Sequence, residues 1–351
     1  MYGSSRNTKN ASARRWIYLA VMLAVLVASA FLLCEHLQER ALHAIPYGFK
    51  KFSLSDPLPT CGRWKEHMPS TRDPATYHLY IEARKLWRSK IEWQLTREET
   101  TRILTDVRKA ADLGDWGARA LLAHFYLEGL GPLESNNVLN PDPYKAVEIA
   151  RMAAKEMQPW GLYDLGVAYE HGYGGAHYDV DLAWAYYLRA AQLGSPEAQM
   201  ALASAYGEAK RPADEIIMQQ CAYRQGHGPA AYALALDAGG DKRYQEGILL
   251  YQEGVKFGSL ECARDLELMF NEGYFWDSDS DEEKAILRSL GIGVDPEREI
   301  RYRAIYEALQ INPDLKLSRL DQVLPLPPTQ LPAWSGVGDA VTPESKGRPA
   351  Y

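Results

Sequence analysis

The sequence predicts an all-α protein, an α-solenoid of about five helix–turn–helix repeats with an N-terminal transmembrane helix and an extended proline-rich C-terminal tail. Three observations predict it. A pattern recurs along the middle of the chain, apolar residues within each copy have helical spacing, and an uncharged stretch lies near the N-terminus. Recurring patterns mark repeat architectures, in which each unit buries its apolar face by stacking on its neighbours.

The repeat is clearest in AAQLGSPEAQMALASAYGEA. A glycine is followed, at steps of four residues, by a small residue, a leucine and an aromatic residue: Gly194, Ala198, Leu202 and Tyr206. Four further copies place related residues at these positions: Gly114, Ala118, Leu122 and Tyr126; Met157, Gly161, Leu165 and Tyr169; Gly226, Ala230, Leu234 and Ala238; Gly258, Cys262, Leu266 and Phe270. Two copies depart from the pattern, because Met157 takes a glycine position and Ala238 an aromatic one.

Steps of four residues place the small residue, the leucine and the aromatic residue on one face of an α-helix. The segment before each glycine is also helical in pattern, and glycine ends that helix because it adopts a left-handed turn without a Cβ clash. A second glycine ends the second helix in three copies: Gly129, Gly172 and Gly273. Each unit is therefore predicted as helix, tight turn, helix and loop. This ladder of residues indicates packing rather than ligand binding.

The run AWAYYLRAAQLGSPEAQMALASAYGEA resembles a Sel1-like repeat, a relative of the tetratricopeptide repeat, and the resemblance covers about residues 106–275. Four further runs, QQCAYRQGHGPAAYAL, YQEGVKFGS, DPEREIRYRAIYEAL and LDQVLPLPPTQLPAWSG, are similar to a bacterial Sel1-like family. Members of that family often occur beside type VI secretion phospholipase effectors and resemble their immunity proteins. The resemblance implies a protein partner, a cognate phospholipase effector whose active site this protein occludes.

The run from Trp16 to Cys34 has 19 uncharged residues, enough for a helix to span a hydrocarbon core of about 30 Å. The preceding residues 1–15 contain four bases and no acid. The positive-inside rule then places residues 1–15 in the cytoplasm and the rest of the chain in the periplasm, as a single-pass inner-membrane protein. The alternative is a cleaved signal peptide, because Ala28, Ser29 and Ala30 supply small residues at a suitable spacing. We favour the anchor because Phe31, Leu32 and Leu33 extend the apolar run.

The formal net charge of the chain is −7, and the bases of residues 1–15 leave the remainder more acidic still. This balance argues against a nucleic-acid partner. An acidic surface accelerates encounter with a basic protein partner, although solubility alone also explains it.

Three cysteines lie beyond the apolar segment: Cys61, Cys221 and Cys262. An odd number leaves at least one free thiol in an oxidising compartment. Cys221 and Cys262 fall in adjacent repeats, so a disulfide between them is conceivable. The alternative is that both are small buried hydrophobic residues.

Proline punctuates residues 35–72, which we expect to form an extended linker. The repeat domain then covers residues 73–275 and opens with a capping helix over 73–93, whose apolar positions have helical spacing. The stretch GPLESNNVLNPDPY, residues 131–144, is an insertion between the first two repeats. It marks either a binding face or a tolerated surface loop.

Residues 276–312 are expected to form a C-terminal helical cap, in which Asp295 and Pro296 stand at the start of a helix. Residues 313–351 form the proline-rich tail. PLPPTQLPAW is consistent with polyproline II lying along the domain, with Trp334 as an anchor. We expect disorder beyond about Val337.

The sequence holds no nucleophile elbow, Walker loop, H-E-x-x-H motif or pair of C-x-x-C motifs. Its eight histidines are scattered, without partners at metal-ligand spacing. We therefore expect no enzyme activity, no catalytic, cofactor-binding or metal-binding residues, no cofactor and no small-molecule substrate. Two rival functions stay open, an envelope scaffold or regulatory adaptor and an enzyme of unrecognised type.

Aromatic residues beside acids have the composition of interface hot spots, and the end of the array carries such a group. We expect partner contacts from Tyr274, Phe275, Trp276, Asp277, Asp279 and Asp281. The alternative is that the aromatic residues seal the last repeat against the helix over 295–310. The three acids also imitate half of a calcium loop, but Glu282 and Arg288 stand where such a loop needs glycine and glutamate.

Overall fold

The computed structural model describes residues 22–23, 26–27, 29–33, 43–272 and 280–341. The chain divides into two units, Met1–Phe49 and Lys50–Tyr351. The expected transmembrane segment, 16–34, lies for its greater part outside the described residues, and those of its residues that are described are helical. No helix among the described residues has the length and apolar character needed to cross a membrane.

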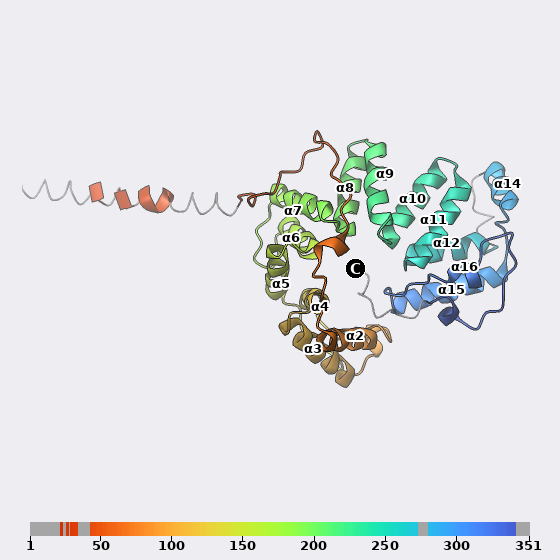
Figure 1. Ribbon diagram of the computed structural model, residues 1–351, viewed down its shortest axis with the longest axis horizontal. Coiled ribbons are helices and arrows are strands. Elements are labelled where there is room, and N and C mark those ends of the chain that lie inside the picture. Colours follow the sequence, from red (N-terminus) through yellow and green to blue (C-terminus); the bar gives the residue numbers. More distant parts are fainter. Residues whose placement is uncertain (1–21, 24–25, 28, 34–42, 273–279, 342–351) are drawn as a thin grey trace, which may run out of the picture. The chain divides into compact units, whose positions relative to one another are not determined.

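Over its described residues, the unit Lys50–Tyr351 consists of helices and the loops between them (Figure 1). An isolated bridge joins Leu130 and Leu139. Its described helices are, in chain order, η1 (Trp64–His67), α2 (Pro74–Trp87), η2 (Glu92–Gln94), α3 (Arg97–Asp112), α4 (Trp116–Glu128), α5 (Pro143–Lys155), α6 (Pro159–His171), α7 (Val180–Gln192), α8 (Pro196–Glu208), α9 (Pro212–Tyr223), α10 (Gly228–Gly240), α11 (Tyr244–Lys256), α12 (Leu260–Phe270), α14 (Asp281–Ser289), α15 (Pro296–Ile311), α16 (Leu320–Val323) and η3 (Val337–Asp339).

The five predicted repeats are the helix pairs α3/α4, α5/α6, α7/α8, α9/α10 and α11/α12, and successive pairs pack on one another. The glycine between the two helices of a pair has φ between 81° and 92° in four repeats: Gly114, Gly194, Gly226 and Gly258. Met157 holds the same place in the second repeat with φ of 58°. The prediction that Met157 occupies a glycine position is therefore confirmed, at the cost of a left-handed backbone that residues with a Cβ rarely adopt.

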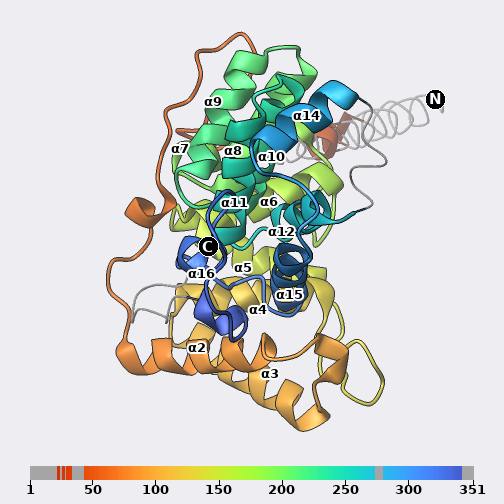
Figure 2. The same cartoon turned by 90° about the vertical axis from the view of Figure 1, so that its right-hand side faces the viewer.

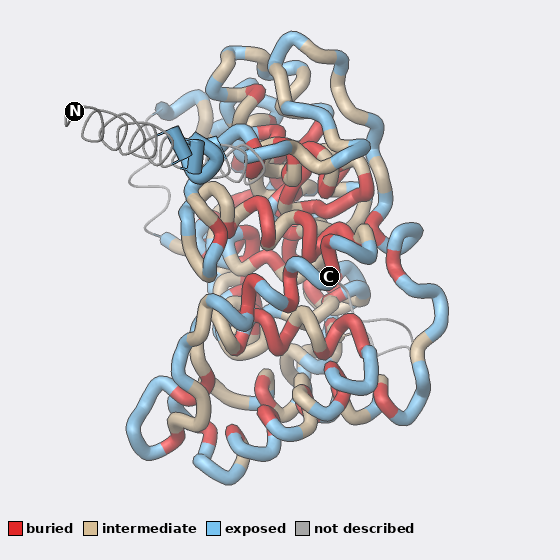
Figure 3. Tube along the Cα trace, turned by 90° about the vertical axis from the view of Figure 1, so that its left-hand side faces the viewer, coloured by how far each residue is buried: buried red, intermediate tan, exposed pale blue. Residues whose placement is uncertain are grey.

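The predicted ladder residues form the core of the array. The small residue after the turn is fully buried in Ala118, Ala198, Ala230 and Cys262, and Leu202 and Leu266 are fully buried as well. Figure 3 shows buried residues along the helices and exposed residues toward the outside. The α-solenoid predicted from the repeat spacing is confirmed.

A capping helix covers the first repeat, but it ends at Trp87 instead of continuing to residue 93 as predicted. Helix α2 begins after Asp73, whose carboxylate accepts a hydrogen bond from the backbone of Thr76, and it packs on α3. The insertion 131–144 folds back onto η2 and the residue after it, because buried Asn136 donates to the carbonyls of Glu92 and Leu95. These contacts tie part of the loop to the scaffold, and both interpretations of the insertion stay predictions.

The expected linker is instead a packed element over its second half. Residues 50–73, which we call the strap, run along the array and are joined to α9 by a disulfide between Cys61 and Cys221. The conceivable bridge between Cys221 and Cys262 does not form, and Cys262 is a free, buried thiol. Cys262 packs closely against Gly254 of its own repeat, so its sulfur faces α11 rather than α9.

Helix α15 begins as predicted, with the Asp295 carboxylate accepting from the backbone of Arg298 and proline at the first position. Residues 313–341 fold against this helix, because buried Arg298 and Arg301 donate to tail carbonyls: Val323, Pro325, Thr329 and Pro332. Side chains must satisfy these carbonyls, because a proline-rich backbone offers few N–H donors.

The expected anchor of the tail, Trp334, is half-buried and lies 5.4 Å from the Arg301 guanidinium. The expected disorder beyond Val337 does not begin there, because η3 follows and Ala340 is fully buried. Residues 342–351 lie outside the described part of the chain.

The two ends of this unit meet. Arg84 of α2 forms a bidentate ion pair with Asp314, which follows α15, at 2.6 and 2.7 Å. Figure 2 shows the C-terminal segments lying close to α2. Burial by itself raises the pKa of Asp314, but the hydrogen bond and charge of Arg84 outweigh it and lower that pKa. The array is therefore closed by a contact between residues 230 positions apart.

Candidate protein-binding surface

The predicted contact residues at the end of the array are only partly described. Tyr274, Phe275, Trp276, Asp277 and Asp279 lie outside the described residues, so that prediction stays a prediction. Asp281 is exposed in the first turn of α14, where Ser280 caps the helix.

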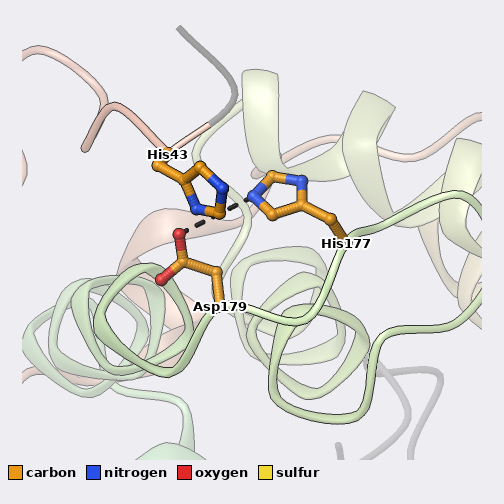
Figure 4. Close-up of side chains that lie close together, drawn as sticks. All are labelled: His43, His177 and Asp179. Carbon is orange, nitrogen blue, oxygen red and sulfur yellow. Dashed lines mark ion pairs between the residues drawn. The ribbon is translucent and has the colours of Figure 1, made fainter. Parts of the chain in front are cut away.

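Two histidines of the unit Lys50–Tyr351 have the following surroundings. His177 lies 3.6 Å from the Asp179 carboxylate (Figure 4) and its ring meets Tyr169 edge to face at 5.4 Å. Asp179 in turn caps α7 by accepting from the backbone of Leu182 at 2.9 Å. Burial and the nearby charge of Lys316 lower the pKa of His227 to about 4, so that imidazole is neutral at pH 7.

A group of half-buried acids and tyrosines lies on the second helices of repeats two and three, α6 and α8, and in the turn that follows α6. Its members, which we call the acidic surface, are Tyr163, Asp164, Tyr173 and Glu197. Asp164 stands one residue before Leu165 of the buried ladder, and Glu197 one residue before Ala198. Neither side chain can join the ladder, since adjacent helical residues point about 100° apart.

Burial raises the pKa of every member of the acidic surface. It raises the pKa of Asp164 to about 7, with a further contribution from the charge of Glu197. It raises the pKa of Glu197 to about 6, although the backbone and Ser195 stabilise that carboxylate by hydrogen bonds. Burial also raises the pKa of Tyr163 and of Tyr173 to about 12, and neighbouring carboxylates add to both shifts.

No base offsets these acids within the described part of the chain. The groups that shift the pKa of Asp164, Glu197 and Tyr173 include no lysine and no arginine. Isolated carboxylates are costly to bury, and a nearby cation favours their charged form. The surface can therefore accept cationic side chains from another molecule.

An aromatic row extends from the acidic surface to the strap. Tyr163 packs on Tyr187 at 5.5 Å between ring centroids, Tyr187 on Trp184 at 5.5 Å, and Trp184 on Phe52 of the strap at 5.1 Å. The Tyr187 hydroxyl donates to Glu170 at 2.6 Å, which holds its ring in place. Tyrosine and tryptophan provide large contact area at low entropic cost, as protein interfaces require.

Sequence reasoning missed the acidic surface, although a signal was present. Neither Asp164 nor Glu197 has a base three or four residues away in its own helix. A base at that spacing would pair with the acid on the helix surface. The signal is weak without knowledge that α6 and α8 bring the two acids together.

The fold is close to that of three Pseudomonas aeruginosa proteins. PA5086 is 26% identical with a TM-score of 0.61, and the match covers 78% of this chain and 96% of that one. Immunity protein Pa5087 is 26% identical with a TM-score of 0.60, and the match covers 77% and 94%. The chain is an α-solenoid similar to immunity proteins.

Immunity protein PA5088 gives a third match, at 25% identity and a TM-score of 0.57, over 77% of this chain and 94% of that one. Residues 269–341 match a domain of unknown function, DUF6396. That range covers the end of α12, helices α14 and α15 and the tail up to residue 341, and the contacts of Arg298 and Arg301 join α15 to the tail. The comparison with curated proteins found no match.

Proposed function

We propose that this protein is an immunity protein that binds a phospholipase effector of a type VI secretion system and occludes its active site. The similarity to immunity proteins Pa5087 and PA5088 over more than three quarters of this chain carries the proposal. The solenoid supports it physically, since stacked repeats provide a large, rigid binding surface. In this proposal the protein acts by binding and has no catalytic activity of its own.

The proposed location is the periplasm, with residues 16–34 as an inner-membrane anchor. The disulfide between Cys61 and Cys221 supports this location, because disulfides form and persist in oxidising compartments. The charge pattern of residues 1–15 favours the same orientation.

The acidic surface is the proposed contact for the effector. Its uncompensated carboxylates and its tyrosines favour a basic partner segment, and cations would hold Asp164 and Glu197 ionised at neutral pH.

The test is expression of the effector from the neighbouring gene in the periplasm, with and without this protein. The protein should restore growth, and the double variant Asp164→Asn, Glu197→Gln should bind the purified effector at least tenfold more weakly. Exposed acids elsewhere provide the matched control, Asp112→Asn with Glu148→Gln.

Failure of the wild-type protein to bind or protect would overturn the proposed function. Wild-type binding together with full binding by the folded double variant would keep the function and move the contact away from the acidic surface.

A further inference from the structure

The two halves of the strap are held unequally. Its second half is built into the core: Trp64 is 2% exposed and packs on Trp116 at 5.9 Å. Arg72 pairs with Asp115 through two hydrogen bonds, and these side chains are 7% and 1% exposed. Gln199 donates to the carbonyl of Gly62 at 3.2 Å.

The first half, Lys50–Thr60, has few contacts. Lys51 pairs with Asp181 at 2.5 Å, but their side chains are 60% and 65% exposed, and such pairs contribute little. Arg211 donates to the carbonyl of Leu54. Phe52 is the main packing contact, half-buried between Trp184 and Tyr206 at 5.1 and 5.9 Å.

The disulfide stands at the boundary between these halves. Cys61 is exposed, whereas Cys221 is 2% exposed within α9. A small dithiol can therefore reach the disulfide from the Cys61 side. Residues 50–60 precede Cys61 in the chain, so the disulfide and the packing of Phe52 are the main attachments of this half to the array.

We propose that the Cys61–Cys221 disulfide is a redox-operated latch for the first half of the strap. When oxidised, it holds Lys50–Thr60 on α7, α8 and α9. When reduced, that half detaches, while Trp64 and Arg72 keep the second half and the repeats in place.

The chemistry of release is thiol–disulfide exchange with a dithiol. One thiolate of the dithiol attacks the sulfur of Cys61, and Cys221 leaves as a thiolate that takes up a proton. The second thiol then attacks the mixed disulfide and releases Cys61. The dithiol is oxidised to a disulfide, and the two cysteines take up two electrons and two protons.

Release of the latch alters the packing of the acidic surface through the aromatic row. Phe52 leaves Trp184, which packs on Tyr187, and Tyr187 packs on Tyr163. This consequence rests on the proposed function, whereas the latch itself does not.

The experiment is limited proteolysis of the full-length protein with subtilisin, which contains no cysteine and tolerates dithiothreitol. Cleavage next to Phe52 and Leu54 should be at least tenfold faster in dithiothreitol than without it. Cleavage next to Trp64 should stay slow in both. Cys61→Ser should reproduce the fast cleavage without reductant, and Cys262→Ser should behave like the wild type.

Equal cleavage of the oxidised and reduced proteins would overturn the latch, because the first half would then be held without the disulfide. Rapid cleavage throughout the repeats on reduction would also overturn it, because the disulfide would then be needed for the whole fold. No effector is used, so neither result bears on the proposed function.

Discussion

At the scale of single residues, Asp164 and Glu197 show how a surface charge can be set by its surroundings rather than by its residue type. Both lie on helices packed for burial, and no base among the described residues offsets them. Their raised pKa values mean that the folded protein holds protons that the unfolded chain releases. This difference predicts a dependence of stability on pH.

The folded pKa of Asp164 is about 7 and its ordinary value is 3.8. Its contribution to stability is therefore greatest at low pH and falls as the pH rises from about 4 to about 7. Asp164→Asn should lack this pH-dependent part of the stability. Its melting temperature should therefore rise relative to that of the wild type between pH 5 and pH 8. Thermal unfolding at four pH values in that range measures it, with exposed Asp112→Asn as control. Parallel profiles for wild type and Asp164→Asn would contradict the burial argument.

At the scale of elements, the repeat ladder decides which helix positions tolerate change. Leu202 and Ser204 lie two residues apart on α8, but Leu202 is fully buried and Ser204 is exposed. The same helix therefore offers a matched pair for testing the predicted packing register.

Leu202→Asp should lower the free energy of unfolding by several kcal/mol, roughly 3 to 5, because it removes packing and buries a carboxylate without a partner. Ser204→Asp should change that free energy by about 0.5 kcal/mol or less. Urea unfolding of both variants gives the comparison. Similar midpoints for the two would mean that the register of α8 is wrong.

At the scale of the whole molecule, the unit Lys50–Tyr351 joins α2, its first α-helix, to the segment that follows α15. The Arg84–Asp314 pair makes this connection, with side chains 22% and 32% exposed. Such partial exposure places its contribution between the roughly 1 kcal/mol of surface pairs and the roughly 3 to 5 kcal/mol lost on breaking buried ones.

Asp314→Asn should leave the Arg84 guanidinium without a carboxylate and loosen α2. Hydrogen exchange should become faster in α2 and near residue 314, and change little in α7 and α8, which lie mid-array. The exposed pair Glu82–Lys85 supplies the control, and Glu82→Gln should leave exchange unchanged. Unaltered exchange in α2 of Asp314→Asn would show that apolar packing alone closes the array.

The predicted orientation in the membrane is also a property of the whole chain. A reporter active only in the periplasm should be active when fused after Tyr351 and inactive when fused at residue 12, because the bases of residues 1–15 hold that end inside. Fusion at Tyr351 leaves the packed tail up to residue 341 intact. The reverse pattern of activity would refute the periplasmic proposal.

The sequence by itself determined the repeat array, because helical packing leaves a local signature. Spacing of four residues between Gly194, Ala198, Leu202 and Tyr206 predicts a turn and a buried face. The capping residues Asp295 and Pro296 predict the start of α15. The sequence also showed that Met157 takes the position that glycine holds in the other copies of the repeat. These features depend on residues within about a dozen positions of one another.

Only the tertiary structure decided which residues far apart in the sequence contact one another. Cys61 pairs with Cys221 across 160 residues, Arg84 with Asp314 across 230, and Asp164 approaches the charge of Glu197 from a different repeat. No periodicity encodes such contacts, because they depend on how the repeats stack and on where the strap and tail run. Local spacing therefore predicts the helices, whereas the stacking of the repeats determines the disulfide, the closure and the acidic surface.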